Sequence, residues 1–148
     1  MSDQPVKYAC PPVFSVELEA LPASLPNLVD GIIPIIASIG WSHADLNRIE
    51  LVVEEAMLNV ALHGYEGKGG WLKVVIEAGD DASLRLTIED SAPRFNPLEM
   101  PSPDCSLAIE DRNIGGLGVH LVRNMSDAAF YSYRDGHNVM QLIFRPRS

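Results

Sequence analysis

Apolar and polar residues alternate along five short stretches of the chain. Phe14, Val16 and Leu18 alternate with polar neighbours, which predicts a strand whose apolar side faces a core. The same period of two recurs at residues 72–76, 84–88, 128–133 and 139–144. Polar turns at 79–81 and 135–136 separate neighbouring stretches and favour tight connections. The pattern therefore predicts five strands, four of them in two hairpins.

Two longer stretches have the period of a helix. Residues 28–39 are mostly apolar and predict a helix, in which Pro34 should cause a kink or delay the start. Residues 45–63 carry an apolar stripe at helical spacing, and either Ser42 or Asp45 can serve as the N-cap. This second helix is the clearest element in the chain.

The order of these elements indicates the fold class. A third helix is expected after Gly118, ending at about Met125. Helices followed by paired strands predict an α+β fold, a two-layer sandwich of a mixed, mainly antiparallel sheet with helices on one face. A chain of 148 residues is enough for one domain and too short for two. We expect a flexible lead-in over residues 1–12 and a single domain over residues 13–148.

The composition argues against several classes of protein. The chain has 20 acidic and 11 basic residues and a formal charge of −9, which argues against direct nucleic-acid binding because that needs clustered Lys and Arg. No apolar run is long enough to cross a membrane, and the first residues lack a secretory signal. Cys10 and Cys105 form no metal or redox motif. We expect a reduced, cytoplasmic protein with no membrane partner.

A polar stripe runs along the predicted second helix beside its apolar face. Glu55, Asn59 and His63 are spaced four residues apart and so share one side of the helix. Asn is a poor residue for a helix interior, and its oxygen beside that of Glu suits a hard cation such as Mg²⁺, or a base next to one. The alternative is the solvated edge of an amphipathic helix.

A carboxylate lies at the end of the predicted strand 84–88. The period of two places Asp90 on the same face as Ile88, which packs against helices, so the charge needs a partner. Arg94 or Arg123 can pair with it, or Asp90 can cap the next loop. The functional alternative is a pocket rim, where Asp90 accepts a hydrogen bond from a ligand amine.

A glycine-rich stretch follows a long loop. Residues 91–114 hold four prolines and few apolar anchors, which is typical of a lid or a binding loop. Gly115, Gly116 and Gly118 then precede the third helix, whose first N–H groups can bind an anion; the alternative is a merely flexible loop. With the Glu–Asn stripe and Asp90, this stretch completes the requirements of a nucleoside triphosphate: a metal site, an amine acceptor and a phosphate-binding loop.

Four segments resemble the motifs of one family. EEAMLNVALHGYEG is similar to the N box of the GHKL ATPases, the superfamily of gyrase, MutL and sensor histidine kinases, and above all to its anti-sigma factor serine-protein kinases. TIEDSAPRFNPLEM and GGLGVHLVRNMSD resemble the two glycine boxes of these kinases, and YSYRDGHNVMQLIF resembles their closing hairpin. The likeness runs from about Phe14 to Phe144 and implies a Bergerat-type ATP-binding fold.

The resemblance implies a role for each matching residue. Glu55 matches the general base for the attacking hydroxyl, Asn59 the ligand that holds Mg²⁺ against the phosphates, and Asp90 the acceptor for the adenine amino group. The other positions implied to bind nucleotide are His63, Ala92, Phe95, Gly115, Gly116, Leu117 and Gly118. Where this chain has Ala92 the family usually has glycine, and the added Cβ can crowd the adenine or restrict the backbone.

The resemblance also implies an activity and partners. It implies a homodimeric anti-sigma factor and serine/threonine kinase that uses ATP and Mg²⁺, binds a sigma factor and phosphorylates a serine of a STAS-type anti-anti-sigma protein. Glu55 and Asn59 favour this kinase, whereas Ala92 leaves open a partner-switching module without kinase activity. A third alternative is a detached sensor-kinase domain that phosphorylates a histidine on another chain, although the chain has no neighbouring helical dimerisation region.

Overall fold

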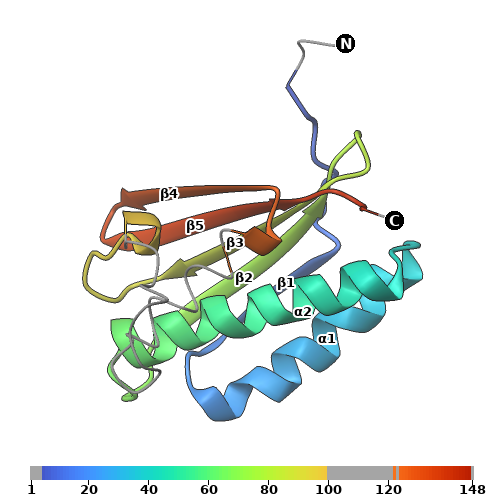
Figure 1. The fold of residues 1–148 in the computed structure, drawn as a ribbon. Coiled ribbons are helices and arrows are strands. Elements are labelled where there is room, and N and C mark those ends of the chain that lie inside the picture. The colour runs from blue at the N-terminus through green and yellow to red at the C-terminus, as the bar shows by residue number, and fades with distance from the viewer. Residues whose placement is uncertain (1–4, 100–121, 123, 148) are drawn as a thin grey trace, which may run out of the picture.

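The structure is a computed structural model in which residues 5–99, 122 and 124–147 are described (Figure 1). Its strands and long helices are β1 (Phe14–Glu19), α1 (Leu25–Ser38), α2 (His43–Leu58), β2 (Trp71–Ala78), β3 (Leu84–Asp90), β4 (Ala128–Arg134) and β5 (His137–Phe144). All five predicted strands and the first two predicted helices are present. Of the predicted third helix, Val122, Asn124 and Met125 are helical, and the rest lies outside the described residues.

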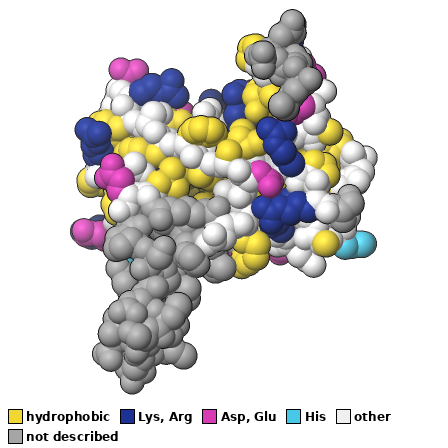
Figure 2. All heavy atoms as spheres, turned by 45° about the horizontal axis from the view of Figure 1, so that its top comes forward, with side chains coloured by type: hydrophobic (Ala, Val, Ile, Leu, Met, Phe, Trp, Pro, Cys, Tyr) yellow, Lys and Arg dark blue, Asp and Glu magenta, His cyan; other side chains and the backbone are white. Residues whose placement is uncertain are grey.

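The strands form one sheet in the order β1-β2-β3-β5-β4. Every strand pair in the described part of the chain is antiparallel. Both helices cover the same face of this sheet (Figure 1), which confirms the α+β prediction. The other face, turned partly toward the viewer in Figure 2, carries apolar side chains interspersed with charged ones.

The core lies between the sheet and the two helices. The inward positions of the strands alternate with outward ones, and the largest fully buried side chains include Ile32, Ile36, Ile49, Val52, Val53, Met57, Leu72, Ile76, Leu84, Leu86, Leu142 and Phe144. Burying a side chain of this size stabilises the fold by about 1.5–3 kcal/mol. The core therefore holds α2 firmly against the inward faces of β3 and β5.

Both helices differ at one end from what the apolar pattern predicts. Helix α1 begins at Leu25, three residues before the predicted start, because Pro26 fits the first turn, where no N–H donor is needed. Helix α2 is capped by Ser42, whose hydroxyl accepts from the backbone N–H of Asp45 at 3.2 Å. Its last predicted turn, Asn59–Gly64, is π-helical.

Candidate nucleotide-binding site

A pocket lies between the end of α2, the end of β3 and the inner sides of β4 and β5. A water-sized sphere can move through about 50 Å³ of it, and all the space between its atoms, open solvent included, amounts to about 600 Å³. The described lining residues are Ala56, Asn59, Val60, Gly64, Ile88, Asp90, Ala92, Pro93, Phe95, Pro97, Leu98, Val122, Tyr131, Asn138 and Met140. Apolar walls with a few convergent polar groups are typical of small-molecule sites.

Asp90 is the charged group among the described residues that line this pocket. Its side chain lies at the end of β3 with 6% of the residue exposed, and its Oδ1 accepts from the Ala92 N–H and from Nδ2 of Asn138, both at 2.9 Å. Its Oδ2 receives no hydrogen bond from the described residues. Burial raises the pKa of Asp90, and the two hydrogen bonds oppose that rise. Asp90 therefore both caps the loop after β3 and keeps one oxygen available to a ligand.

Of the two arginines predicted as possible partners of Asp90, one lies among the described residues. The Arg94 guanidinium lies over the Tyr133 ring, 5.5 Å from its centroid, and the polar partners of Asp90 are instead Ala92 and Asn138. Pairing with Arg94 is therefore wrong, since an amide and a backbone N–H stabilise the carboxylate instead. Arg123 lies outside the described residues.

Asn59 is the first residue of the π-helical turn and lines the same pocket as Asp90. The wider turn is a common feature of functional sites, because it changes which side chains a helix end presents. No described residue hydrogen-bonds to the Asn59 side-chain amide, so its oxygen is available to a ligand or a cation. The structure thus brings together the predicted amine acceptor and the predicted metal ligand.

Tyr65 fastens the end of this turn to the sheet. Its hydroxyl donates to the backbone oxygen of Trp71 at 2.6 Å and accepts from the Ser91 N–H at 2.8 Å. The Tyr65 ring also lies against Gly70, where a Cβ would approach it to 2.3 Å. This residue therefore fixes the distance between the helix end and the loop that follows Asp90.

Ala92 occupies the first glycine-box position without the strain that a Cβ can cause. It is buried, and it does not belong to the described residues with positive φ. Its methyl faces Gly64, where a Cβ would lie 3.0 Å from the Ala92 Cβ. The absence of a side chain at Gly64 therefore makes room for the methyl at Ala92.

This contact predicts a compensating pair of substitutions. Gly64→Ala should destabilise the protein by about 1–2 kcal/mol, because the new methyl crowds Ala92. Adding Ala92→Gly should recover most of that loss. Urea unfolding of both single variants and the double variant measures the coupling between the two positions. Purely additive effects would contradict the packing described here.

The remaining predicted site residues have varied positions. Ala92 and Phe95 line the pocket with Asn59 and Asp90, and Phe95 keeps 39% of its surface exposed. Glu55 is partly exposed one helical turn before Asn59, and His63 is exposed; neither lines the pocket. The predicted phosphate-binding residues Gly115, Gly116, Leu117 and Gly118 lie outside the described residues.

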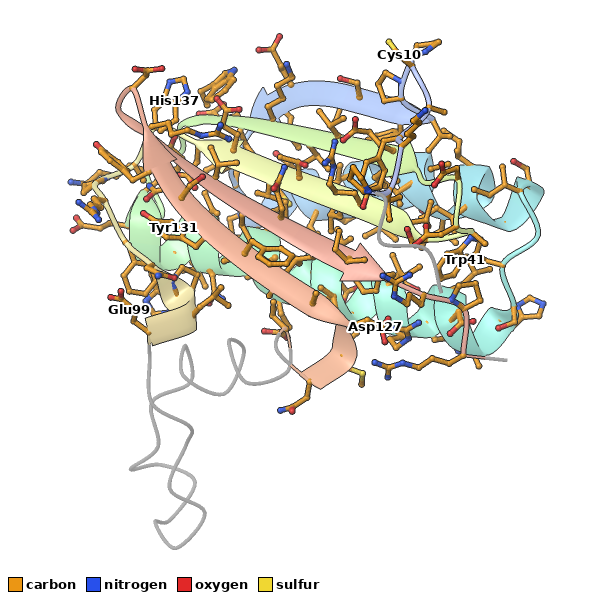
Figure 3. The ribbon with its side chains drawn as sticks, turned by 90° about the horizontal axis from the view of Figure 1, so that it is seen from above. Cys10, Trp41, Glu99, Asp127, Tyr131 and His137 are labelled. Atoms are coloured by element: carbon orange, nitrogen blue, oxygen red, sulfur yellow. The ribbon has the colours of Figure 1, made fainter. Side chains whose placement is uncertain are left out.

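Two residues that bring polar groups to the lining, Asn138 and Tyr131, were not expected from the sequence. Asn138 lies opposite Asp90 in the β3–β5 register, and Tyr131 comes from the neighbouring strand β4, at the same end of the sheet as Glu99 (Figure 3). The period of two places both on the inner face, which is the signal that could have found them. Their proximity to Asp90 depends on strand register, which the pattern alone does not determine.

Two features are absent from the described residues. They contain no group of three or more His, Cys, Asp or Glu side chains arranged to hold a metal ion. None of their helices has both the length and the apolar character needed to cross a membrane.

Residues 18–144 match the family model of the histidine kinase-like ATPase domain. The chain belongs to this family. The resemblance found in the sequence motifs is thereby confirmed, because the match covers the N box, the Asp90 strand and the closing hairpin.

Curated relatives of this ATPase domain are named as kinases and anti-sigma factors. The serine/threonine-protein kinase BtrW of Bordetella bronchiseptica is 26% identical over 103 residues, 69% of this chain and 72% of that protein. The serine-protein kinase RsbW of Bacillus mycoides is 22% identical over 113 residues, 74% of this chain and 70% of the relative. An anti-sigma F factor of Bacillus cereus is 26% identical over 92 residues, 62% of this chain and 63% of the relative.

A solved structure shows the same fold. The crystal structure of the RsbU and RsbW domains of a Mycobacterium tuberculosis protein superposes with a TM-score of 0.62 at 16% identity, covering 89% of this chain. This chain spans about a third of that protein, since the match covers 32% of it. The likeness supports the fold, and the function rests on the site and the sequence relatives.

Proposed function

We propose that this ATPase domain binds ATP with Mg²⁺ and transfers the γ-phosphoryl group to a serine or threonine hydroxyl of a partner protein. The observation that carries the proposal is one apolar pocket that presents the Asp90 carboxylate and the Asn59 amide. An ionised carboxylate oxygen accepts from the adenine amino group, and the apolar walls suit the base. Residues 13–148 would then form one ATP-binding domain.

The residues present fit a magnesium ion. Mg²⁺ in phosphoryl-transfer sites is held by one or two protein oxygens together with substrate phosphates, so a dedicated acidic cluster is unnecessary. Asn59 would hold the ion through its amide oxygen. When bound, Mg²⁺ neutralises charge on the phosphates. Glu55, one turn earlier on α2, would orient the attacking hydroxyl and accept its proton.

The proposed partners rest on the relatives' names and on the motif resemblance. Relatives called serine-protein kinase and anti-sigma F factor support an anti-sigma role, and we further propose, as the motif resemblance implies, that the protein is a cytoplasmic homodimer. In this role the chain would bind a sigma factor and phosphorylate a serine of a STAS-type anti-anti-sigma protein.

One observation favours a second candidate function. Glu55 does not line the pocket, so ATP binding there does not depend on Glu55 acting as a base. The alternative is a partner-switching module that responds to nucleotide, or ignores it, without phosphorylating its partner.

Incubation of the protein with γ-labelled ATP, Mg²⁺ and candidate STAS-type and sigma-factor partners separates the two functions. If the protein is a kinase, one partner should become labelled. The label should resist acid, as it does on phosphoserine. Tight partner binding without label transfer supports the switching module instead. Absence of both ATP binding and partner binding would contradict both functions.

A further inference from the structure

Asn138 is a buried amide whose two ends are both fully engaged. Its Nδ2 donates to Asp90 Oδ1 at 2.9 Å and to the backbone oxygens of Ala92 and Pro93 at 3.1 and 3.3 Å. Its Oδ1 accepts from the Phe95 N–H at 3.0 Å and from the hydroxyl of Tyr131 at 2.5 Å. Only 6% of the residue is exposed.

These partners allow one orientation of the amide. Three acceptor oxygens surround Nδ2, whereas the backbone N–H of Phe95 can only donate and therefore requires Oδ1. A flipped amide would place oxygen against the Asp90 carboxylate and leave the Phe95 N–H without an acceptor. Such losses are expensive at a buried position. The Asn138 side chain is therefore held in place by its own network.

The loop after β3 depends on this network for its shape. Its backbone N–H groups donate to side chains: Ser91 to the Tyr65 hydroxyl, Ala92 to Asp90, Phe95 to Asn138 and Leu98 to Asn96. Asn138 contacts this loop through three backbone groups, more than any of the other side chains in that set. A change at Asn138 therefore affects both the carboxylate and the loop that encloses the pocket.

The same bonds determine which Asp90 oxygen meets a ligand. Because Oδ1 accepts from both Asn138 and the Ala92 N–H, the carboxylate cannot turn without breaking two hydrogen bonds. Oδ2 is left as the oxygen that no described residue engages. The carboxylate therefore presents Oδ2 as an acceptor in one fixed direction.

We propose that Asn138 is a positioning residue for base recognition, which holds Asp90 so that Oδ2 accepts from a 6-amino purine and disfavours a 6-oxo purine. A 6-oxo purine would place its carbonyl oxygen against the carboxylate, and acceptor facing acceptor is repulsive. This inference rests on the proposed nucleotide binding and adds the residue that sets its base preference.

The substitution Asn138→Asp tests the role with almost no change in shape. It replaces the NH2 group that donates to Asp90 and to the Ala92 and Pro93 oxygens with an oxygen. Two carboxyl groups about 3 Å apart would then share one proton, so Asp90 would lose its fixed donor and part of its charge. Affinities for Mg²⁺-ATP and Mg²⁺-ITP are measured by calorimetry. ATP binding should weaken by about tenfold or more, ITP binding should change little, and the ATP/ITP preference should fall by a similar factor.

Asn96→Asp is the matched control. It adds a carboxylate to the loop that Asn138 contacts, and its Oδ1 can still accept from the Leu98 N–H. Its ATP/ITP preference should stay within about twofold of wild type, because Asn96 does not line this pocket.

Tyr131→Phe provides a second test if Asn138→Asp does not fold. It removes the hydroxyl that donates to Asn138 Oδ1 and keeps the ring in the pocket wall. The ATP/ITP preference should fall by about threefold, because Asn138 keeps its Phe95 contact.

The outcomes distinguish this inference from the proposed function. If wild type binds ATP and the variants that fold keep the wild-type ATP/ITP ratio, Asn138 is only structural and the inference is overturned. Equal losses for both nucleotides would overturn it too, since they indicate a collapsed pocket. If wild type binds neither nucleotide, the proposed function fails, and the inference fails with it.

Discussion

Glu55→Gln should reduce phosphoryl transfer to the partner protein by about a hundredfold or more, while ATP binding stays near the wild-type value. Glutamine keeps the shape of the side chain but cannot accept the proton of the attacking hydroxyl. Because Glu55 does not line the pocket, its loss should leave nucleotide affinity intact. Single-turnover transfer from labelled ATP measures the first quantity, and calorimetry measures the second.

Glu54→Gln is the matched control for this experiment. Glu54 is the adjacent residue on α2, so its side chain leaves the helix about 100° away from that of Glu55. Burial raises the pKa of Glu54, with further contributions from Glu50 and Glu55, so a perturbed carboxylate alone does not mark the base. Transfer by Glu54→Gln should resemble wild type. A Glu55→Gln protein that transfers phosphate at the wild-type rate would show that Glu55 is only a residue of the helix surface.

Arg48→Met should lower the free energy of unfolding by about 3 kcal/mol or more, the range for removing one partner of a buried ion pair. Arg48 is 7% exposed and donates to Asp45 at 3.0 Å, to Asp127 at 3.1 Å and to the backbone oxygens of Met125 and Arg145. It therefore joins α2 to both ends of the β4–β5 hairpin; Asp127, just before β4, is labelled in Figure 3.

The pKa of Asp45, an acidic partner of Arg48, reflects these contacts. Burial alone would raise the pKa of Asp45, but hydrogen bonds from Arg48 and from the Arg147 N–H hold it below its usual value. The folded pKa is the lower one, so this carboxylate stabilises the fold at neutral pH, and that contribution is lost as the pH falls below about 4. Arg48→Met should remove part of this acid sensitivity together with the stability.

Arg85→Met is the control for the charge-removing substitution. Arg85 pairs with Glu77 at 2.9 Å and its guanidinium lies over the Tyr8 ring, 3.8 Å from the centroid. Both charged side chains keep about a quarter of their surface in solvent, so the loss should be about 1 kcal/mol, well below that of Arg48→Met. Urea unfolding at pH 7 compares the two variants. Equal destabilisation by Arg48→Met and Arg85→Met would contradict the structural role assigned to Arg48.

Local patterns in the sequence were sufficient for the elements but not for their contacts. The period of two found all five strands, because each strand packs one face on the helices. The apolar stripe of α2 continues through Asn59–Gly64, so it gives no sign of the change from α to π geometry there. Asp90 was recognised because a charge on a core-facing position is unusual.

The missing parts of the site come from contacts between distant residues. Asn138 contacts Asp90 across 48 positions of sequence, and Arg48 reaches Asp127 across 79. Neither contact leaves a periodic signal, because the first depends on the register of β3 with β5 and the second on how α2 packs against the β4–β5 hairpin. The methyl of Ala92 likewise fits only because residue 64 is a glycine. The sequence alone indicates Gly64 only as the end of a helix.

The measurement that tests the central claim most directly is calorimetric titration of wild type and Asp90→Asn with Mg²⁺-ATP. We expect measurable binding by wild type and a loss of about tenfold or more in the variant. The amide oxygen would stay with the Ala92 N–H and Asn138, so the NH2 group that replaces Oδ2 would set a donor against the adenine amino group. The variant should keep its cooperative unfolding, since an amide oxygen still accepts from the Ala92 N–H. Equal ATP affinity in the two proteins, or no binding by wild type at millimolar ATP, would contradict the account.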